Sequence, residues 1–269
     1  MIRRISLTLT VAALAATTAI AGTSGFQSTF EETGFTYPPL NTPINYSFPA
    51  PIGTFVVMSN DNIVLTDLDP VRGSLPCDPT TLRALILDAT TTSAHLRYEF
   101  PMAARGMIVL DRAVLGAETG DSFGMEWGVY SAITRREETV FQFGPNDQVL
   151  VYGRPVDIGG GQFLTYQNLW ANDCAAGIDN HFTVTAIHDL VGGTVRVEIL
   201  THGNGATSYQ LGPFASNPET NSEGIRGMFS RAPGGTGRFY NDKMVCNGSA
   251  PVIVPPTGDS PSGGSRRRY

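Results

Sequence analysis

The residues best suited to chemistry in this 269-residue chain are an acidic side chain and a tryptophan that stand together, Glu126 and Trp127. A carboxylate beside an aromatic ring suggests a glycosidase. Glycoside hydrolysis needs two carboxylates across the scissile bond, about 5–5.5 Å apart in retaining enzymes. The segment Met125–Tyr130 is typical of a strand. The alternative to a glycosidase acid is therefore that Glu126 is a solvent-facing acid on a strand. We keep Glu126 as a candidate ligand contact.

Four aromatic side chains are candidates to stack on sugar rings: Trp127, Trp170, Tyr152 and Tyr166. The alternative for each is a place in a hydrophobic core. Trp170 is the strongest candidate, because its stretch Leu169–Cys174 ends with loop character. Trp127 lies inside an expected strand and is the weaker ligand-binding candidate.

Other catalytic patterns favour structural explanations. Gly120–Gly124 matches the G-x-S-x-G nucleophile elbow, but that motif needs a helix after the serine, and a strand pattern follows here. We therefore expect a glycine-rich loop. The four histidines have neither metal-site nor catalytic-triad spacing.

The charge balance argues against two classes of partner. The chain has 18 Lys+Arg and 24 Asp+Glu. Without Arg3 and Arg4, which belong to the expected signal peptide described below, the formal net charge is 16 − 24 = −8. Nucleic acid needs a basic surface, so we expect no nucleic-acid partner. Attraction to anionic membranes is disfavoured for the same reason.

The first 21 residues have the pattern of a secretory signal peptide. Arg3 and Arg4 precede the apolar run Ile5–Ala19, and Ala19-Ile20-Ala21 forms a small-x-small cleavage site before Gly22. The run is too short for a good membrane span, so we expect no transmembrane segment in the mature chain. The expected location is secreted or extracytoplasmic, in the periplasm or on the cell surface.

The elements that position these residues are expected to be strands. Ala94–Phe100 alternates strictly, with Ala94, Leu96, Tyr98 and Phe100 inward and His95, Arg97 and Glu99 outward. Thr194–Ile199 repeats the pattern, with Arg196 and Glu198 outward. Met107–Leu110 and Gln148–Tyr152 are apolar on both faces and predict central strands. No segment has a convincing amphipathic helix pattern; Pro79–Leu87 is the best helix candidate, and Ile86-Leu87 suits a strand equally well.

These strands predict one domain over residues 22–249. Gly192-Gly193 predicts a hairpin turn before Thr194. Short strands separated by turns at regular spacing indicate an all-β sandwich or barrel. Residues 250–269 are rich in Pro, Gly and Ser and end in three Arg, which predicts a flexible tail.

The chain resembles the concanavalin A-like lectin/glucanase superfamily, including laminin-G-like secreted domains. The likeness lies in the opening Phe26–Phe35, the strand pair from His181 to Gly205, and the close Gly237–Val245, which is similar to a last strand that pairs beside the first. It implies an antiparallel two-sheet jelly-roll sandwich. Glucanases of the superfamily carry E-x-D-x-x-E on one strand, and this chain lacks the second and third acids after Glu126.

The resemblance also suggests an ion and a disulfide. In similar binding modules an opening-strand acid and a closing-strand acid share a structural calcium, which places Glu32 (with Glu31) and Asp242 as candidate ligands. An early strand near the closing strand favours a Cys77–Cys246 disulfide, with Cys174 free. The two other pairings of the three cysteines remain open.

Export, the strand pattern and the missing acid pair together predict a non-catalytic module that binds polysaccharide or surface glycan. The alternatives are a polysaccharide hydrolase or lyase of the same architecture, and a structural envelope protein. Ligand identity and oligomeric state are left open.

Overall fold

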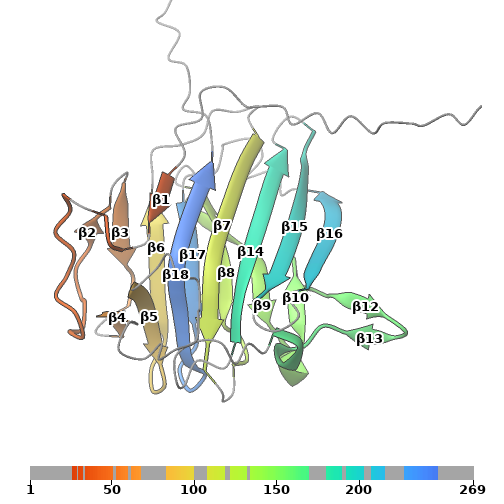
Figure 1. Ribbon diagram of the computed structural model, residues 1–269, viewed down its shortest axis with the longest axis horizontal. Coiled ribbons are helices and arrows are strands. Elements are labelled where there is room, and N and C mark those ends of the chain that lie inside the picture. The colour runs from red at the N-terminus through yellow and green to blue at the C-terminus, as the bar shows by residue number, and fades with distance from the viewer. Residues whose placement is uncertain are drawn as a thin grey trace, which may run out of the picture.

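A computed structural model of the chain shows a sandwich of two antiparallel sheets (Figure 1). It describes residues 26–28, 30–32, 34–50, 53–59, 62–67, 83–99, 108–118, 122–131, 134–169, 180–189, 192–202, 207–215 and 227–247. The expected signal peptide, the expected tail, Trp170, Cys77 and Cys174 lie outside the described residues.

Sheet A has eight strands in the order β16-β15-β14-β7-β18-β5-β4, with β1 also paired to β18. Their bounds are β16 Ser208–Ala215, β15 Thr194–Thr201, β14 Asn180–Asp189, β7 Ile108–Ala117, β18 Gly237–Asn247, β5 Arg83–Ala89, β4 Ile63–Asp67 and β1 Phe26–Ser28. The last strand therefore lies beside the first, as the resemblance implied.

Sheet B also has eight strands, in the order β11-β10-β9-β8-β17-β6-β3-β2. Their bounds are β11 Arg154–Pro155, β10 Val149–Val151, β9 Arg136–Phe143, β8 Glu126–Ser131, β17 Gly227–Ala232, β6 Ala94–Glu99, β3 Thr54–Val57 and β2 Phe48–Pro49. A small hairpin of β12 (Asp157–Gly159) and β13 (Gln162–Phe163) stands apart, and two short 3-10 turns cover Pro145–Asp147 and Tyr166–Leu169.

The alternation predicted from the sequence is confirmed on β6 and β15. Leu96 and Tyr98 are fully buried, and Val195, Val197 and Ile199 are buried in the same way on β15. Because side chains alternate across a strand, the polar residues between them face outward. The hairpin turn at Gly192-Gly193 joins β14 to β15, as expected.

One expectation about these elements is confirmed and one needs correction. Ile86-Leu87, which suited a strand, lies in β5, which begins at Arg83, ends at Ala89 and pairs with β4 and β18. Gln148–Tyr152 was expected as a central strand, but β10 has three residues and its neighbour β11 is the edge of sheet B. Its apolar character comes from Val149 and Val151, which point into the core.

The core lies between the two sheets and is rich in aromatic rings. Phe141 of sheet B packs on Phe182 of sheet A with ring centroids 4.9 Å apart, and Phe143 lies 5.9 Å from the same ring. Trp127 is fully buried in this layer. A core of this kind fixes both sheets and leaves their outer faces as the surfaces on which sites are built.

No helix in the described part of the chain is long and apolar enough to cross a bilayer.

Candidate functional site

The two neighbouring candidates from the sequence, Glu126 and Trp127, point to opposite faces of β8. Trp127 belongs to the core and has no exposed surface, so we do not carry it forward as a ligand contact. Glu126 lies on the outer face of sheet B. Tyr166 is buried in the core, whereas Tyr152 is half-buried beside Phe214, with ring centroids 5.5 Å apart.

Glu126 is part of an ion cluster that we define as His95, Arg97, Glu126, Glu137 and Arg231. Arg231 Nε donates a hydrogen bond of 2.5 Å to Glu126 Oε1, and Arg231 Nη1 lies 3.7 Å from Glu137 Oε2. Glu137 Oε1 accepts a 2.6 Å hydrogen bond from Arg97 Nε and lies 2.8 Å from His95 Nε2. One guanidinium thus stands between two carboxylates.

Strand register brings the cluster together. Arg231 on β17 pairs with His95 on one side and with Glu126 on the other. The five side chains come from four adjacent strands, β6, β17, β8 and β9, in the middle of sheet B. Their convergence depends on the order of strands that are distant in sequence.

Aromatic rings and one glycine complete this face. Phe229 lies opposite Gly128, where an added Cβ would come within 2.1 Å of the Glu138 carbonyl oxygen and 2.7 Å of the Phe229 ring. The Arg97 guanidinium stacks over Tyr130, 4.3 Å from the ring centroid. The absence of a side chain at Gly128 therefore leaves room for the Phe229 ring.

The electrostatics of the ion cluster favour the ionised form of the Glu137 carboxylate. Burial raises the pKa of Glu137, but hydrogen bonds and charge from His95 and Arg97 outweigh burial, so its pKa lies below the usual value. A general acid in glycoside hydrolysis needs a raised pKa. The side chains of Glu126 and Glu137 are only 8% and 13% exposed, and both are already engaged within the cluster. The ion cluster therefore organises the sheet face and suits neither acid catalysis nor open ligand contact.

A second ion network lies on the outer face of sheet A. Arg238 Nε donates to Asp88 Oδ2 at 2.9 Å, and its Nη1 donates to Glu118 Oε1 at 3.1 Å. Tyr240 donates its hydroxyl to the same Glu118 oxygen at 2.5 Å. The pKa of Asp88 is lowered: burial raises it, and the bonds from Thr90 and Arg238 more than offset that effect. These groups also satisfy one another.

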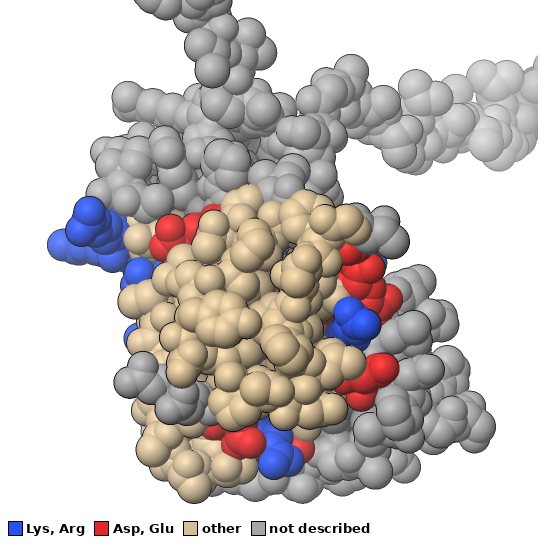
Figure 2. Space-filling view, turned by 90° about the vertical axis from the view of Figure 1, so that its left-hand side faces the viewer, with Lys and Arg blue, Asp and Glu red and all other residues tan. Residues whose placement is uncertain are grey.

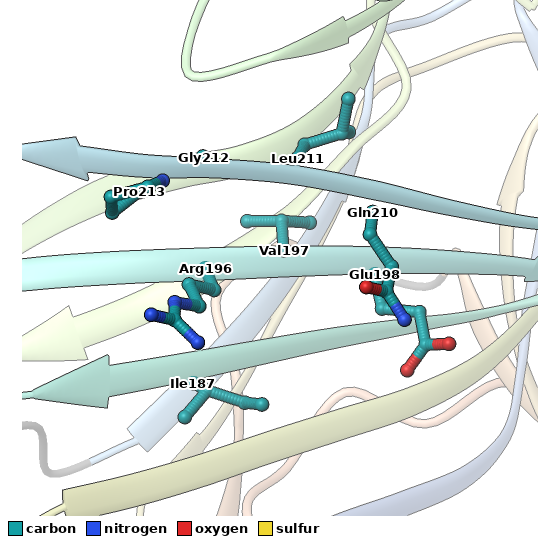
Figure 3. A pocket seen from close by; sticks show the side chains of 8 residues that line it. All are labelled: Ile187, Arg196, Val197, Glu198, Gln210, Leu211, Gly212 and Pro213. Atoms are coloured by element: carbon teal, nitrogen blue, oxygen red, sulfur yellow. The ribbon is translucent and has the colours of Figure 1, made fainter. Parts of the chain in front are cut away.

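A different arrangement occurs at the other end of sheet A, where β14, β15 and β16 form a shallow groove of about 470 Å³. The groove is lined by Ile187, Arg196, Val197, Glu198, Gln210, Leu211, Gly212 and Pro213 (Figure 3). In Figure 3 the side chains of Arg196 and Ile187 lie side by side, and Glu198 lies beside Gln210. A volume of this size is within the usual range of ligand sites.

A β-bulge opens the groove. Val195 pairs with Phe214 and Val197 with Leu211, so the two residues Gly212 and Pro213 stand opposite Arg196 alone. Gly212 has a φ of +98°, and an added Cβ would lie 2.9 Å from the Val195 carbonyl oxygen. Only glycine fits this backbone, and its missing side chain helps to leave the hollow.

The polar groups of the groove are available, unlike those of the ion cluster. Arg196 and Gln210 are both exposed. Within the described ranges, Arg196 has no ion-pair partner and the Gln210 side chain has no hydrogen bond. Glu198 accepts a 2.6 Å hydrogen bond from Ser208 and keeps further acceptor capacity. Ile187 is 38% exposed, and it provides an apolar floor beside these groups.

Several solved structures are similar to this chain. Peanut lectin in complex with a nonapeptide is 12% identical, with 84% of this chain and 97% of that chain covered and a TM-score of 0.43. Winged bean acidic lectin with methyl-α-D-galactose has the same identity and TM-score, with 84% and 98% covered. A structure described with endo-acting O-glycanases of the human gut microbiota is 9% identical, with 83% of this chain and 98% of that chain covered and a TM-score of 0.41. The structure itself confirms the all-β, antiparallel two-sheet sandwich that the sequence predicted.

Sequence comparison adds nothing to the architecture. No protein-family model matches the chain, and no characterised protein is detectably similar in sequence.

The two expected calcium ligands have different partners. Tyr37 donates its hydroxyl to Glu32, and Asp242 Oδ2 lies 3.7 Å from His181 Nε2. His181 also stacks on His202, with ring centroids 4.3 Å apart. Among the residues that the structure describes, no three His, Cys, Asp or Glu side chains gather so as to hold a metal ion. The calcium site stays a prediction.

The groove was missed at the sequence level, although part of it was visible. The alternation of Thr194–Ile199 placed Arg196 and Glu198 on the outward face, where the structure has them. The signal that would have located the hollow is Gly212-Pro213 inside an expected strand region, because such residues mark a bulge or an edge.

Proposed function

We propose that this protein is an exported, non-catalytic module that binds a neutral glycan in the groove formed by β14, β15 and β16. The observation that carries the proposal is the combination of available polar groups with an apolar floor. Arg196 donates, Glu198 accepts, and Gln210 does both, which matches the donors and acceptors of adjacent sugar hydroxyls. Ile187 and Pro213 offer apolar surface for the C–H side of a sugar ring.

The charge of the groove indicates the class of glycan. One guanidinium and one carboxylate line it, so the formal charge of the lining side chains sums to zero. A polyanion would meet Glu198 as well as Arg196, and the whole chain is acidic, with a formal charge of −6. A neutral polysaccharide avoids that repulsion.

Binding without hydrolysis is supported by the state of the acidic residues. Hydrolysis needs one carboxylic acid that holds its proton and a second carboxylate opposite. The pKa of Glu137 is lowered, and Glu126 is engaged by Arg231 and by the Thr139 hydroxyl. The groove itself contributes a single carboxylate, from Glu198.

Retention of the purified mature protein on insoluble neutral polysaccharides (cellulose, chitin, xylan and starch) tests the proposal, with pectate as an acidic comparison. We expect retention on at least one neutral polymer. Arg196→Ala should weaken it by about tenfold or more, because a hydrogen bond to a charged group contributes about 1.5–3 kcal/mol. Gln210→Ala should weaken it by about two- to tenfold, because a neutral hydrogen bond contributes about 0.5–1.5 kcal/mol.

The matched control is Arg136→Ala, which removes an exposed arginine from β9 on the other sheet and should leave retention unchanged. Release of reducing sugar from any polymer would contradict the non-catalytic role. Equal retention by the wild type and both groove variants would show that the groove is not the site.

A further inference from the structure

A long stretch of the sequence that lies at one side of the molecule contains no charged residue. Residues 33–60 contain no Asp, Glu, Lys, Arg or His, in a chain with 16% charged residues. The described parts of this stretch, residues 34–50 and 53–59, lie at the end of the sandwich that holds β2, β3 and β4 (Figure 1). We call their exposed surface the uncharged face.

The uncharged face also gathers apolar side chains. Of the eight large hydrophobic residues that are exposed in the described part of the chain, four belong to it: Phe35 at 38%, Leu40 at 36%, Tyr46 at 50% and Met58 at 46%. Figure 2 looks at this side and shows a broad surface without charged side chains, with acidic and basic groups around its rim. Aromatic residues and Met are enriched in protein–protein interfaces, while Lys, Glu and Asp are depleted.

The loop that forms this face is held rigidly. Asn41 N donates to Leu65 O and Ile44 N to Ile63 O, both at 2.7 Å, which ties the loop to β4. Beneath it, Phe48 is buried and stacks on Phe55 with ring centroids 5.0 Å apart. A surface that is ordered before binding loses little conformational entropy on association.

We propose that the uncharged face binds a second copy of this chain in a two-fold dimer. A two-fold interface places the same patch on both partners, so any net charge within it would face its own kind. A charge-free patch is electrostatically compatible with itself. The chain carries a formal charge of −6, so two copies repel through their other surfaces and approach most easily here.

Neither edge strand at this end provides the contact by extending its sheet. β4 of sheet A already accepts hydrogen bonds from Asn41 and Ile44 of the loop. β2 of sheet B has two residues, and Pro49 lacks the N–H that a pairing strand needs. Side chains of the uncharged face therefore form the interface. The groove on β14–β16 lies at the opposite end of sheet A, so dimerisation leaves both grooves open.

Sedimentation velocity of the mature secreted protein over a concentration series tests the dimer. We expect a reversible monomer–dimer equilibrium that shifts toward the dimer as NaCl rises from about 0.05 M to about 0.5 M, because salt screens repulsion between acidic copies. Tyr46→Glu and Met58→Glu place like charges across the two-fold axis, and each should weaken association by about tenfold or more.

Phe163→Glu is the matched control, since Phe163 is 42% exposed on the β12–β13 hairpin outside the uncharged face, and it should leave association unchanged. Circular dichroism checks that every variant folds. A wild type that stays monomeric at all concentrations overturns the proposal. If Tyr46→Glu also loses polysaccharide retention in that case, the uncharged face binds sugar instead of a second copy of the chain. A dimer that survives both face substitutions also overturns it.

Discussion

At the scale of single residues, His188 shows how burial shapes the pH response. Its side chain is fully buried on β14, following the inward residues Phe182, Val184 and Ala186. Burial disfavours the charged imidazole and lowers the pKa of His188 from 6.5 to about 3. The folded protein therefore holds this histidine neutral at pH values where the unfolded chain binds a proton.

We expect the free energy of unfolding to fall as pH drops from 6.5 towards 3, because the unfolded state gains the proton that the native state refuses. The slope from one such group approaches about 1.4 kcal/mol per pH unit. Glu137 and Asp88 lower the free energy of unfolding further at lower pH, since their pKa values are also lowered in the folded protein. Urea unfolding of the wild type and of His188→Leu at pH 7, 6 and 5 measures the effect. The variant should have the flatter profile, and parallel profiles would contradict the assignment.

At the scale of elements, each strand presents one face to the core and one to the surface. β15 is the clearest case, since Ile199 has no exposed surface while its neighbour Leu200 is 36% exposed. The two side chains are isomers of the same size and differ chiefly in the direction in which they point. The pair isolates the contribution of burial from that of residue type.

Ile199→Asp should unfold the domain or cost more than about 4 kcal/mol, because it buries an unpaired charge between the sheets. Leu200→Asp should change stability by no more than about 1 kcal/mol, because its carboxylate reaches water. Thermal melts of both variants provide the comparison. Similar melting temperatures for the two would mean that the face assignment of β15 is wrong.

At the scale of the whole molecule, the covalent state of the mature chain is the main open prediction. The signal peptide, the Cys77–Cys246 disulfide and the free Cys174 all depend on residues outside the described ranges, apart from the backbone of Cys246 on β18. Cys246 pairs in register with Phe26 and Asp111, in the interior of sheet A.

We expect the secreted protein to begin at or near Gly22 and to be lighter by two hydrogens than the fully reduced mature chain. Intact mass before and after reduction measures both features, and non-reducing peptide mapping then identifies the linked pair. Such a bond closes a loop of well over 100 residues and would stabilise the fold by about 4–5 kcal/mol in the chain-entropy model. A linked peptide that contains Cys174 would contradict the pairing, and an intact Met1 would contradict export.

Local patterns in the sequence determined the strand class, the inward residues of β6 and β15 and the hairpin at Gly192-Gly193. They did so because side-chain alternation and turn chemistry depend on neighbours along the chain. The same alternation placed Arg97, Arg196 and Glu198 on outward faces. Resemblance to a known superfamily supplied the two-sheet arrangement and the closing strand beside the first.

Tertiary structure alone decided which outward residues meet. Arg231 reaches Glu126 across 105 positions of sequence, and Arg238 reaches Asp88 across 150, because strand order brings their strands together. Trp127 entered the core and Glu126 was engaged by Arg231, so the most suggestive pair in the sequence was not the most available site. The groove depends on a bulge at Gly212-Pro213, whose register with Val195 and Val197 exists only once the strands are paired.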